Sequence, residues 1–141
     1  MAISFHPKAG ALLLCSYEPG FKEPEMVKRR PAIVVTPRLR RRDGLCTVVP
    51  LSTTEPQSIE AYHHAIEFER ALPSPWSTKK CWVKADMVAT VGFHRLDLIG
   101  IGRDHEGKRR YLNFCISDED LKCIRVCILH ALNLGHLTPH L

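Results

Sequence analysis

Arg30 precedes a strongly apolar segment and is the residue of this sequence best placed to bind a phosphate. It is the last of three consecutive cations, and Pro31–Thr36 follows as a predicted strand. Pro31 favours an extended backbone at Arg30 and cannot donate to a sheet ladder, so it suits a strand's first residues. A guanidinium held there offers a charged, planar fork, and Glu25 lies close enough in the loop to orient it or pair with it. The simpler alternative is a basic loop ahead of a buried strand.

A second apolar segment, Gly44–Thr54, ends in three adjacent hydroxyl residues that begin at Ser52. A further predicted strand, Gly10–Tyr17, lies in front of the charged loop. The order is therefore strand, loop with E-x4-R-P, strand, glycine, strand, P-L-S-T. If these two strands are neighbours in the sheet, the Ser52 hydroxyl lies close to Arg30. Alternation along a strand would turn Thr53 to the opposite face.

This order of motifs resembles the MazF/PemK family of toxin endoribonucleases. The resemblance covers roughly residues 8–101, and a strand and helix at 109–135 complete one expected domain of residues 1–141. It implies an all-β fold with a C-terminal helix, a small SH3-like barrel of the MazF/PemK/CcdB-like type. It also implies that Arg30 and Ser52 cleave RNA and that Glu25 supports them.

Two positions depart from the family pattern. Ser52 stands where the family usually has threonine, and an acid-then-glutamine element is matched only as Asp86-Met87. A non-catalytic RNA- or protein-binding relative, or a gyrase-binding toxin of the same fold, therefore stays open. The arginine of the R-P motif argues against a gyrase-binding toxin, because such a toxin needs no phosphate-binding cation beside a hydroxyl.

The chemistry implied by the resemblance is metal-independent cleavage of single-stranded RNA. The ribose 2′-OH attacks its own phosphate and leaves a 2′,3′-cyclic phosphate and a 5′-hydroxyl, with no metal and no organic cofactor. Expected partners are single-stranded RNA, a second copy of the chain in a homodimer, and a cognate antitoxin protein. A cytoplasmic protein without a membrane segment is expected.

The formal charge of +5 and the pI near 9.0 favour an acidic partner such as RNA. Basic residues cluster in predicted loops or at strand ends, including Lys108–Arg110, and such loops could form one phosphate-binding groove. The alternative is a set of separate solvated loops. The candidate RNA contacts are Lys28, Arg29, Arg38, Arg40, Arg41, Arg42, Thr53, Lys79 and Lys80.

Six cysteines and eight histidines offer rival chemistry. Most of the cysteines lie in apolar runs and no secretory signal precedes them, so buried, reduced thiols are expected rather than disulfides. Cys123, Cys127 and His130 share a helical spacing, but structural zinc needs four ligands in a closed shell, so no metal site is predicted. No histidine pair is tied by position to a phosphate-binding cation, so a histidine-dependent ribonuclease is disfavoured.

Short strands and one helix account for the rest of the chain. Predicted strands are His64–Arg70, Lys80–Lys84, His94–Ile101 and Arg110–Ile116, with Ala85–Val91 either a helical turn or a further strand. Ser117 is a good N-cap for a helix that Gly135 would end. Its apolar face, expected to pack on the barrel or on a second subunit, comprises Leu121, Ile124, Ile128 and Leu132.

Overall fold

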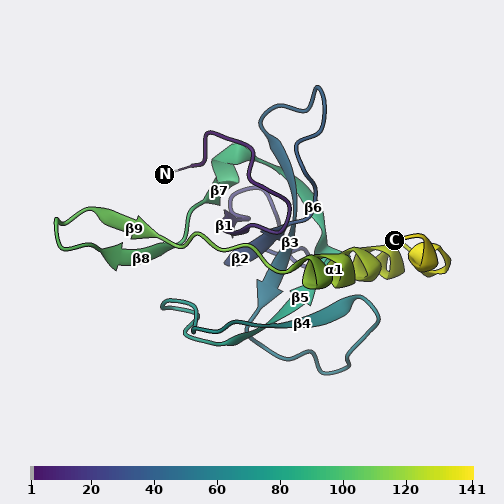
Figure 1. Ribbon diagram of the computed structural model, residues 1–141. Coiled ribbons are helices and arrows are strands. Elements are labelled where there is room, and N and C mark those ends of the chain that lie inside the picture. Colours follow the sequence, from purple (N-terminus) through teal and green to yellow (C-terminus); the bar gives the residue numbers. More distant parts are fainter. Residues whose placement is uncertain (1) are drawn as a thin grey trace.

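The chain folds into a mostly β structure with one long C-terminal helix, as the sequence predicts (Figure 1). The structure is a computed structural model that describes residues 2–141. The main sheet consists of β1 (Leu12–Ser16), β2 (Arg29–Val34), β3 (Leu45–Ser52), β4 (His63–Glu67), β5 (Lys80–Lys84), β6 (Ala89–Gly92) and β7 (Leu96–Asp97). The remaining elements are the hairpin strands β8 (Gly100–Arg103) and β9 (Arg109–Tyr111), the helix α1 (Asp118–Ala131), and 3-10 turns at Ala85–Met87, Phe93–Arg95 and Gly135–His140.

The main sheet is antiparallel, with the order β4-β5-β3-β2-β1-β7. β3 is its longest strand and connects two halves. Its first four residues pair with β6, and its last two pair with β5. Among the described residues no pairing closes the sheet into a ring, so the expected barrel closure is not confirmed.

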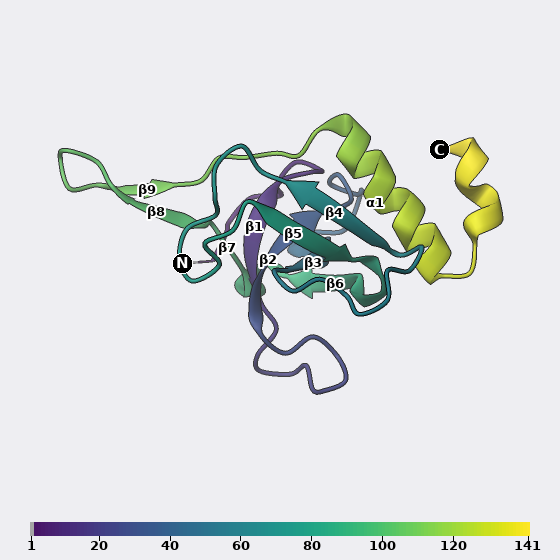
Figure 2. The same ribbon diagram turned by 90° about the horizontal axis from the view of Figure 1, so that it is seen from below.

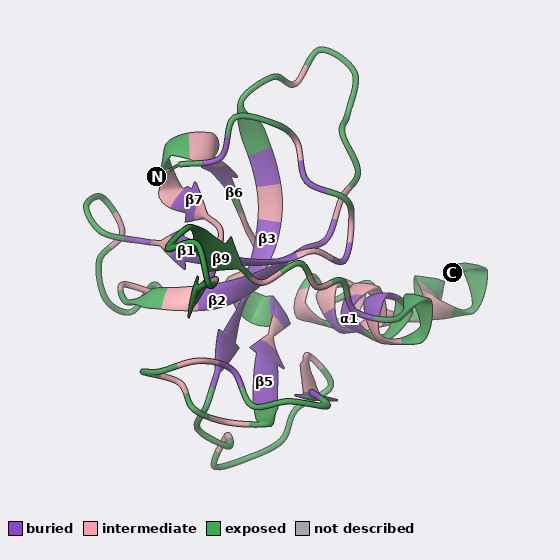
Figure 3. Cartoon of the chain, turned by 60° about the vertical axis from the view of Figure 1, so that its left-hand side comes forward, coloured by how far each residue is buried: buried purple, intermediate pink, exposed green. Residues whose placement is uncertain are grey.

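Apolar residues on both faces of the central strands produce two cores. One core lies under α1 and includes Leu12, Ile33, Val49, Leu51 and Val83. The other lies on the opposite face, where the N-terminal segment and the β1–β2 loop cover Leu13, Ala32, Val34 and Val48. Figure 3 shows the buried residues concentrated in these strands. Burial on both faces explains why β1 to β3 read as nearly continuous apolar runs rather than alternating ones.

The predicted N-terminus of the helix is confirmed, but its end differs. The Ser117 side chain accepts a hydrogen bond from the Asp120 backbone N–H at 3.1 Å. At the other end Asn133, not Gly135, adopts the left-handed conformation, with φ of 59°. Its N–H donates to the His130 carbonyl, and the Leu134 N–H donates to the Leu129 carbonyl, which is the Schellman arrangement.

Three other sequence expectations need correction. Leu132 is 56% exposed, so it does not pack on the sheet as Leu121 and Ile124 do. The expected strand at 94–101 is a 3-10 turn followed by β7, and β8 starts only at Gly100. The expected strand at 110–116 is regular only in β9. Beyond it the alternating side chains of Leu112–Ile116 still meet the core under α1, although the backbone forms only isolated contacts with β1.

The β8–β9 hairpin and the C-terminal segment project in opposite directions from the sheet (Figures 1 and 2). α1 packs along β4 and the Ala85–Met87 turn. Within residues 2–141, no helix combines the length and apolarity required to cross a bilayer.

Candidate active site

Arg30 is the second residue of β2, and the register of the sheet places it opposite Ser52. The cross-strand pairs Ala32↔Pro50 and Ile33↔Val49 define the β2–β3 register. Extending that register by two residues aligns Arg30 with Ser52, and directly opposed residues on antiparallel strands point to the same face. The sheet therefore brings the predicted cation and the predicted hydroxyl together at one end.

The Arg30 side chain is half-buried, and its Nε atom is fully buried without a hydrogen-bond partner among the described residues. Buried polar groups are nearly always satisfied, and an unsatisfied one costs about 1–3 kcal/mol. Its charge is also felt by the Cys81 thiol, whose pKa burial raises to about 11 while Arg30 works in the opposite direction. A charged, partly desolvated donor of this kind is suited to an anionic ligand.

Ser52 lies at the end of β3 and is buried, with 4% of its surface exposed. Its hydroxyl accepts from the Thr54 N–H at 3.2 Å and donates to the Thr54 carbonyl at 3.4 Å. The second bond is long and therefore weak. The hydroxyl thus stabilises the turn after β3, and it can exchange that weaker bond for a ligand. Thr53 is exposed, in contrast to its neighbour.

Trp82 and Lys80 extend the same row across β5. Trp82 is the cross-strand partner of Ser52, and the Lys80 Nζ atom lies 5.1 Å from the centre of the Trp82 ring. That distance is within the range of a cation–π contact. Lys79 adjoins Lys80 at the start of β5, so both of these predicted RNA contacts lie at the Ser52 end of the sheet.

Glu25 is exposed on the β1–β2 loop, and its Oε1 atom accepts a hydrogen bond from the Lys22 N–H at 3.1 Å. It lines a pocket of about 500 Å³ together with Lys28, Arg30 and Met87. No ion pair within 4.0 Å joins Glu25 to Arg30 in the described part of the chain. The pocket nevertheless unites the predicted carboxylate and cation. It also contains Met87, one of the two departures from the family pattern.

Arg95 holds the loop that carries Glu25, and no sequence pattern marks this role. Its guanidinium donates to three backbone carbonyls at the end of β1 and in the loop, those of Ser16 (3.2 Å), Tyr17 (2.9 Å) and Pro19 (2.7 Å). It also lies over the Phe21 ring, 5.0 Å from its centre. Gly20 has φ of 116°, and a Cβ there would lie 2.7 Å from the Arg95 Nη2 atom. Glycine at 20 therefore permits this close approach.

The predicted basic clusters do not meet in one groove. The loop with Arg38 to Arg42 joins β2 to β3 and lies beyond the end of β2 that is farther from Arg30 (Figure 1). Val34, the last residue of β2, comes four residues after Arg30, which is about 13 Å at about 3.3 Å per residue. There Arg38 pairs with Asp43, and Arg42 donates to the hydroxyls of Thr47 and Thr90. These contacts stabilise the loop itself. Arg40 and Arg41 are exposed at its tip.

The remaining clusters lie nearer the site. Lys28 lines the Glu25 pocket, whereas Arg29 lines a different pocket with Arg109 and Arg110 of the β8–β9 hairpin. Within residues 2–141, no three histidine, cysteine or acidic side chains gather in a way that could hold a metal ion.

Comparison with known proteins shows the family of this chain. A profile of the PemK-like, MazF-like toxins of type II toxin–antitoxin systems matches residues 8–121. The chain belongs to this family. The match extends past the motifs that suggested it and includes β8, β9 and the first turn of α1.

Individual relatives span nearly the whole chain. The Escherichia coli (strain K12) protein YifN is 29% identical, with 94% of this chain and 96% of YifN covered. A mycobacterial endoribonuclease solved with its cognate antitoxin has a TM-score of 0.60 at 20% identity, covering 91% of this chain and 96% of the other. MazF from Deinococcus radiodurans gives 0.57 at 20% identity, covering 92% and 99%. At these identities the solved structures establish the shared fold.

Proposed function

We propose that this member of the family is a toxin-type endoribonuclease that cuts single-stranded RNA. The observation that carries the proposal is Arg30, a half-buried guanidinium whose Nε has no hydrogen-bond partner within residues 2–141. Arg30 is aligned with the Ser52 hydroxyl and shares a pocket with Glu25. A cation, a hydroxyl and a carboxylate at one sheet end form a suitable set for chemistry at a phosphodiester. The family and the endoribonucleases among its structural neighbours support the same reaction.

The nucleophile in this proposal is the substrate's own ribose. The 2′-oxygen forms a bond to phosphorus in line with the breaking bond to the 5′-oxygen, so the products are a 2′,3′-cyclic phosphate and a 5′-hydroxyl. The 2′-OH loses its proton and the leaving oxygen gains one, so the reaction needs no added water and no oxidant. Holding these groups in line is a positioning task for the pocket.

Each residue has a distinct role in the proposed reaction. Arg30 stabilises the charge that develops on the phosphoryl oxygens, and it donates a proton or a hydrogen bond to the leaving 5′-oxygen. Ser52 hydrogen-bonds the same phosphate by giving up its 3.4 Å bond to Thr54. Glu25 orients Arg30 or assists removal of the 2′-OH proton. Neither a metal ion nor an organic cofactor takes part.

Partners follow from the same assignment. The proposed substrate is single-stranded RNA, and the active form is a homodimer silenced by a cognate antitoxin protein. An antitoxin is present in the mycobacterial neighbour complex, and MazF of Deinococcus radiodurans was also solved with MazE.

A non-catalytic RNA-binding protein is the second candidate. It is favoured by the burial of Ser52 and by the thioether of Met87 in the Glu25 pocket. Incubating the protein with a long single-stranded RNA and mapping the ends separates the two candidates, with the Arg30→Ala variant as control. Discrete cuts that vanish in the variant support the nuclease. Binding without cuts supports the second candidate.

A further inference from the structure

A second pocket, of about 460 Å³, lies on the other side of β2 from the Arg30 pocket. It is formed where β2, the Ser74–Trp76 loop and the β8–β9 hairpin approach one another. We call it the arginine groove. Its principal lining residues are Arg29, Trp76, Arg103, Arg109, Arg110 and Tyr111.

The charge of the arginine groove is strongly one-sided. Four guanidinium groups line it, and among the described residues its one carboxylate is Asp97, whose Oδ2 lies 3.8 Å from the Arg29 Nη2. Arg103 donates to the Gly107 carbonyl at 2.8 Å, which stabilises the hairpin. The side chains of Arg109 and Arg110 form no hydrogen bond or ion pair with another described residue. Their donors are therefore available to a ligand.

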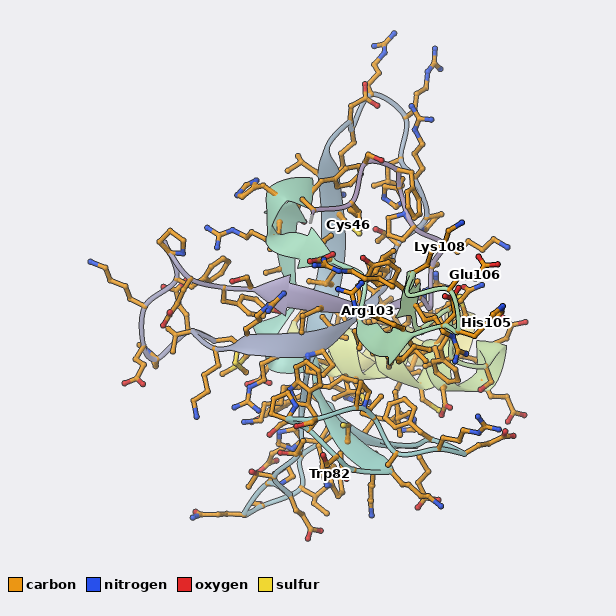
Figure 4. All side chains as sticks on the ribbon, turned by 90° about the vertical axis from the view of Figure 1, so that its left-hand side faces the viewer. Cys46, Trp82, Arg103, His105, Glu106 and Lys108 are labelled. Carbon is orange, nitrogen blue, oxygen red and sulfur yellow. The ribbon has the colours of Figure 1, made fainter. Side chains whose placement is uncertain are left out.

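Two aromatic rings accompany these arginines. Tyr111 is 41% exposed on β9, and Trp76 is half-buried on the facing loop. Nucleobases stack on exposed aromatic rings while arginines bind the phosphates between them, and this combination is typical of single-strand binding surfaces. Acidic peptides would use the charge but would have little use for the rings. Figure 4 looks at the hairpin end-on, with Arg103, His105, Glu106 and Lys108 displayed around it.

The groove also continues from the proposed cleavage site. Arg29 and Arg30 are adjacent in β2, so their Cα atoms are about 3.8 Å apart, and alternation directs their side chains to opposite faces. RNA whose scissile phosphate lies against Arg30 can therefore pass its flanking phosphates over the end of β2 to Arg29.

We propose that the arginine groove binds the single-stranded RNA that flanks the scissile phosphate, an inference that rests on the proposed function. Arg29, Arg109 and Arg110 contact its phosphates, and Tyr111 stacks on a base. The groove thus increases the affinity for RNA and positions the strand along the protein, whereas Arg30 and Ser52 act on the scissile phosphate.

Binding to a fluorescent, uncleavable single-stranded RNA with 2′-O-methyl groups throughout tests this assignment. The double variant Arg109→Ala/Arg110→Ala should raise Kd at least about tenfold and reduce the slope of log K against log salt by about 1.4, the value for two lost phosphate contacts. Tyr111→Ala should weaken binding roughly five- to a hundredfold, and Tyr111→Phe should retain it. Lys8→Ala/Lys122→Ala is the charge-matched control, since both lysines are exposed and neither lines the groove.

Each outcome decides the question. If the parent protein cleaves RNA while the double variant binds like the control, the groove assignment is wrong and the proposed function stands. If the parent neither binds nor cleaves RNA, both are wrong. If the double variant loses binding to a polyglutamate peptide but keeps its RNA affinity, the groove serves an acidic protein partner, and the RNA assignment is overturned.

Discussion

Arg29 and Arg30 are consecutive residues of β2 that serve two different pockets. Arg30 shares one pocket with Glu25 and Met87, and Arg29 lines the arginine groove on the other side of the strand. The sequence alone does not show that two adjacent arginines act at different sites. Alternation along the strand directs their side chains to opposite faces of the sheet. This separation makes their substitutions directly comparable, because the variants remove equal charge from neighbouring backbone positions.

Replacing Arg30 with alanine should lower the single-turnover cleavage rate at saturating RNA by at least about a hundredfold, the scale of removing one preorganised charge-stabilising donor. Arg29→Ala, the matched control, should act mainly on binding. Arg30→Lys should restore little, since a point charge cannot reproduce the fork. Circular dichroism and thermal melting check that each variant is folded. A folded Arg30→Ala protein with near-parental cleavage would remove Arg30 from the mechanism.

Ser52 and Thr53 can be distinguished by three substitutions. Ser52→Thr should preserve cleavage because the hydroxyl remains, Ser52→Ala should lower it strongly, and Thr53→Ala should be nearly silent. Ser52→Ala should also reduce the free energy of unfolding by about 1 kcal/mol through the lost bonds to Thr54. Urea denaturation measured beside cleavage rates separates the two effects. A strong loss in Thr53→Ala with an active Ser52→Ala would show that the exposed hydroxyl contacts the substrate instead.

Arg95 should act on cleavage through the β1–β2 loop. Arg95→Ala removes three hydrogen bonds to carbonyls at the end of β1 and in the loop. The free energy of unfolding should therefore fall by about 2 kcal/mol or more, and amide exchange in residues 17–28 should accelerate. Cleavage should fall because Glu25 is no longer held beside Arg30. Arg70→Ala, an exposed charge removed elsewhere, is the control. Unchanged exchange in the loop together with reduced cleavage would contradict a positioning role.

The cysteines should fall into two reactivity classes. Burial raises the pKa of Cys15, Cys46, Cys81 and Cys127 to about 11, so each is almost entirely a neutral thiol at pH 8, and a thiol reagent attacks the thiolate. Cys115 and Cys123 are exposed. A chromogenic disulfide reagent should therefore titrate two thiols rapidly in the native protein and six after denaturation. Fast reaction of more than two native thiols would contradict the burial.

The sequence predicted those features that depend on local chemistry. The Ser117 cap was identified because the capping residue and the acidic first turn are adjacent in the chain. The end of α1 was misplaced because Asn133 and Gly135 both tolerate the left-handed conformation, and packing selects between them. The alignment of Arg30 with Ser52 followed from two adjacent strands. Placing the Arg38–Arg42 loop in the same groove was wrong for a topological reason, since a loop from β2 to β3 lies at the far end of both strands.

Long-range contacts were beyond sequence reasoning. Arg95 is nearly eighty residues from the carbonyls it binds, and no local pattern marks it. The alternation of apolar and polar residues in Leu112–Ile116 correctly indicated that every second side chain faces the core. It could not reveal that the backbone of this segment contacts β1 only at isolated points. The arginine groove likewise depends on three segments that only the fold brings together.

The products of cleavage provide the most specific test of the proposed reaction. The proposed site consists of a guanidinium, a hydroxyl and a carboxylate, so the attacking oxygen should be the substrate's 2′-oxygen rather than a metal-bound hydroxide. Cleavage should persist in chelator and leave a 2′,3′-cyclic phosphate and a 5′-hydroxyl, identified by mass spectrometry of the fragments. A single 2′-deoxy substitution at the scissile nucleotide should block cleavage but leave Kd nearly unchanged, because phosphate contacts dominate affinity. The same substitution one nucleotide away, as the matched control, should be cut normally. Cleavage of the substituted strand, or a strict requirement for an added divalent ion, would exclude this mechanism even for an active nuclease.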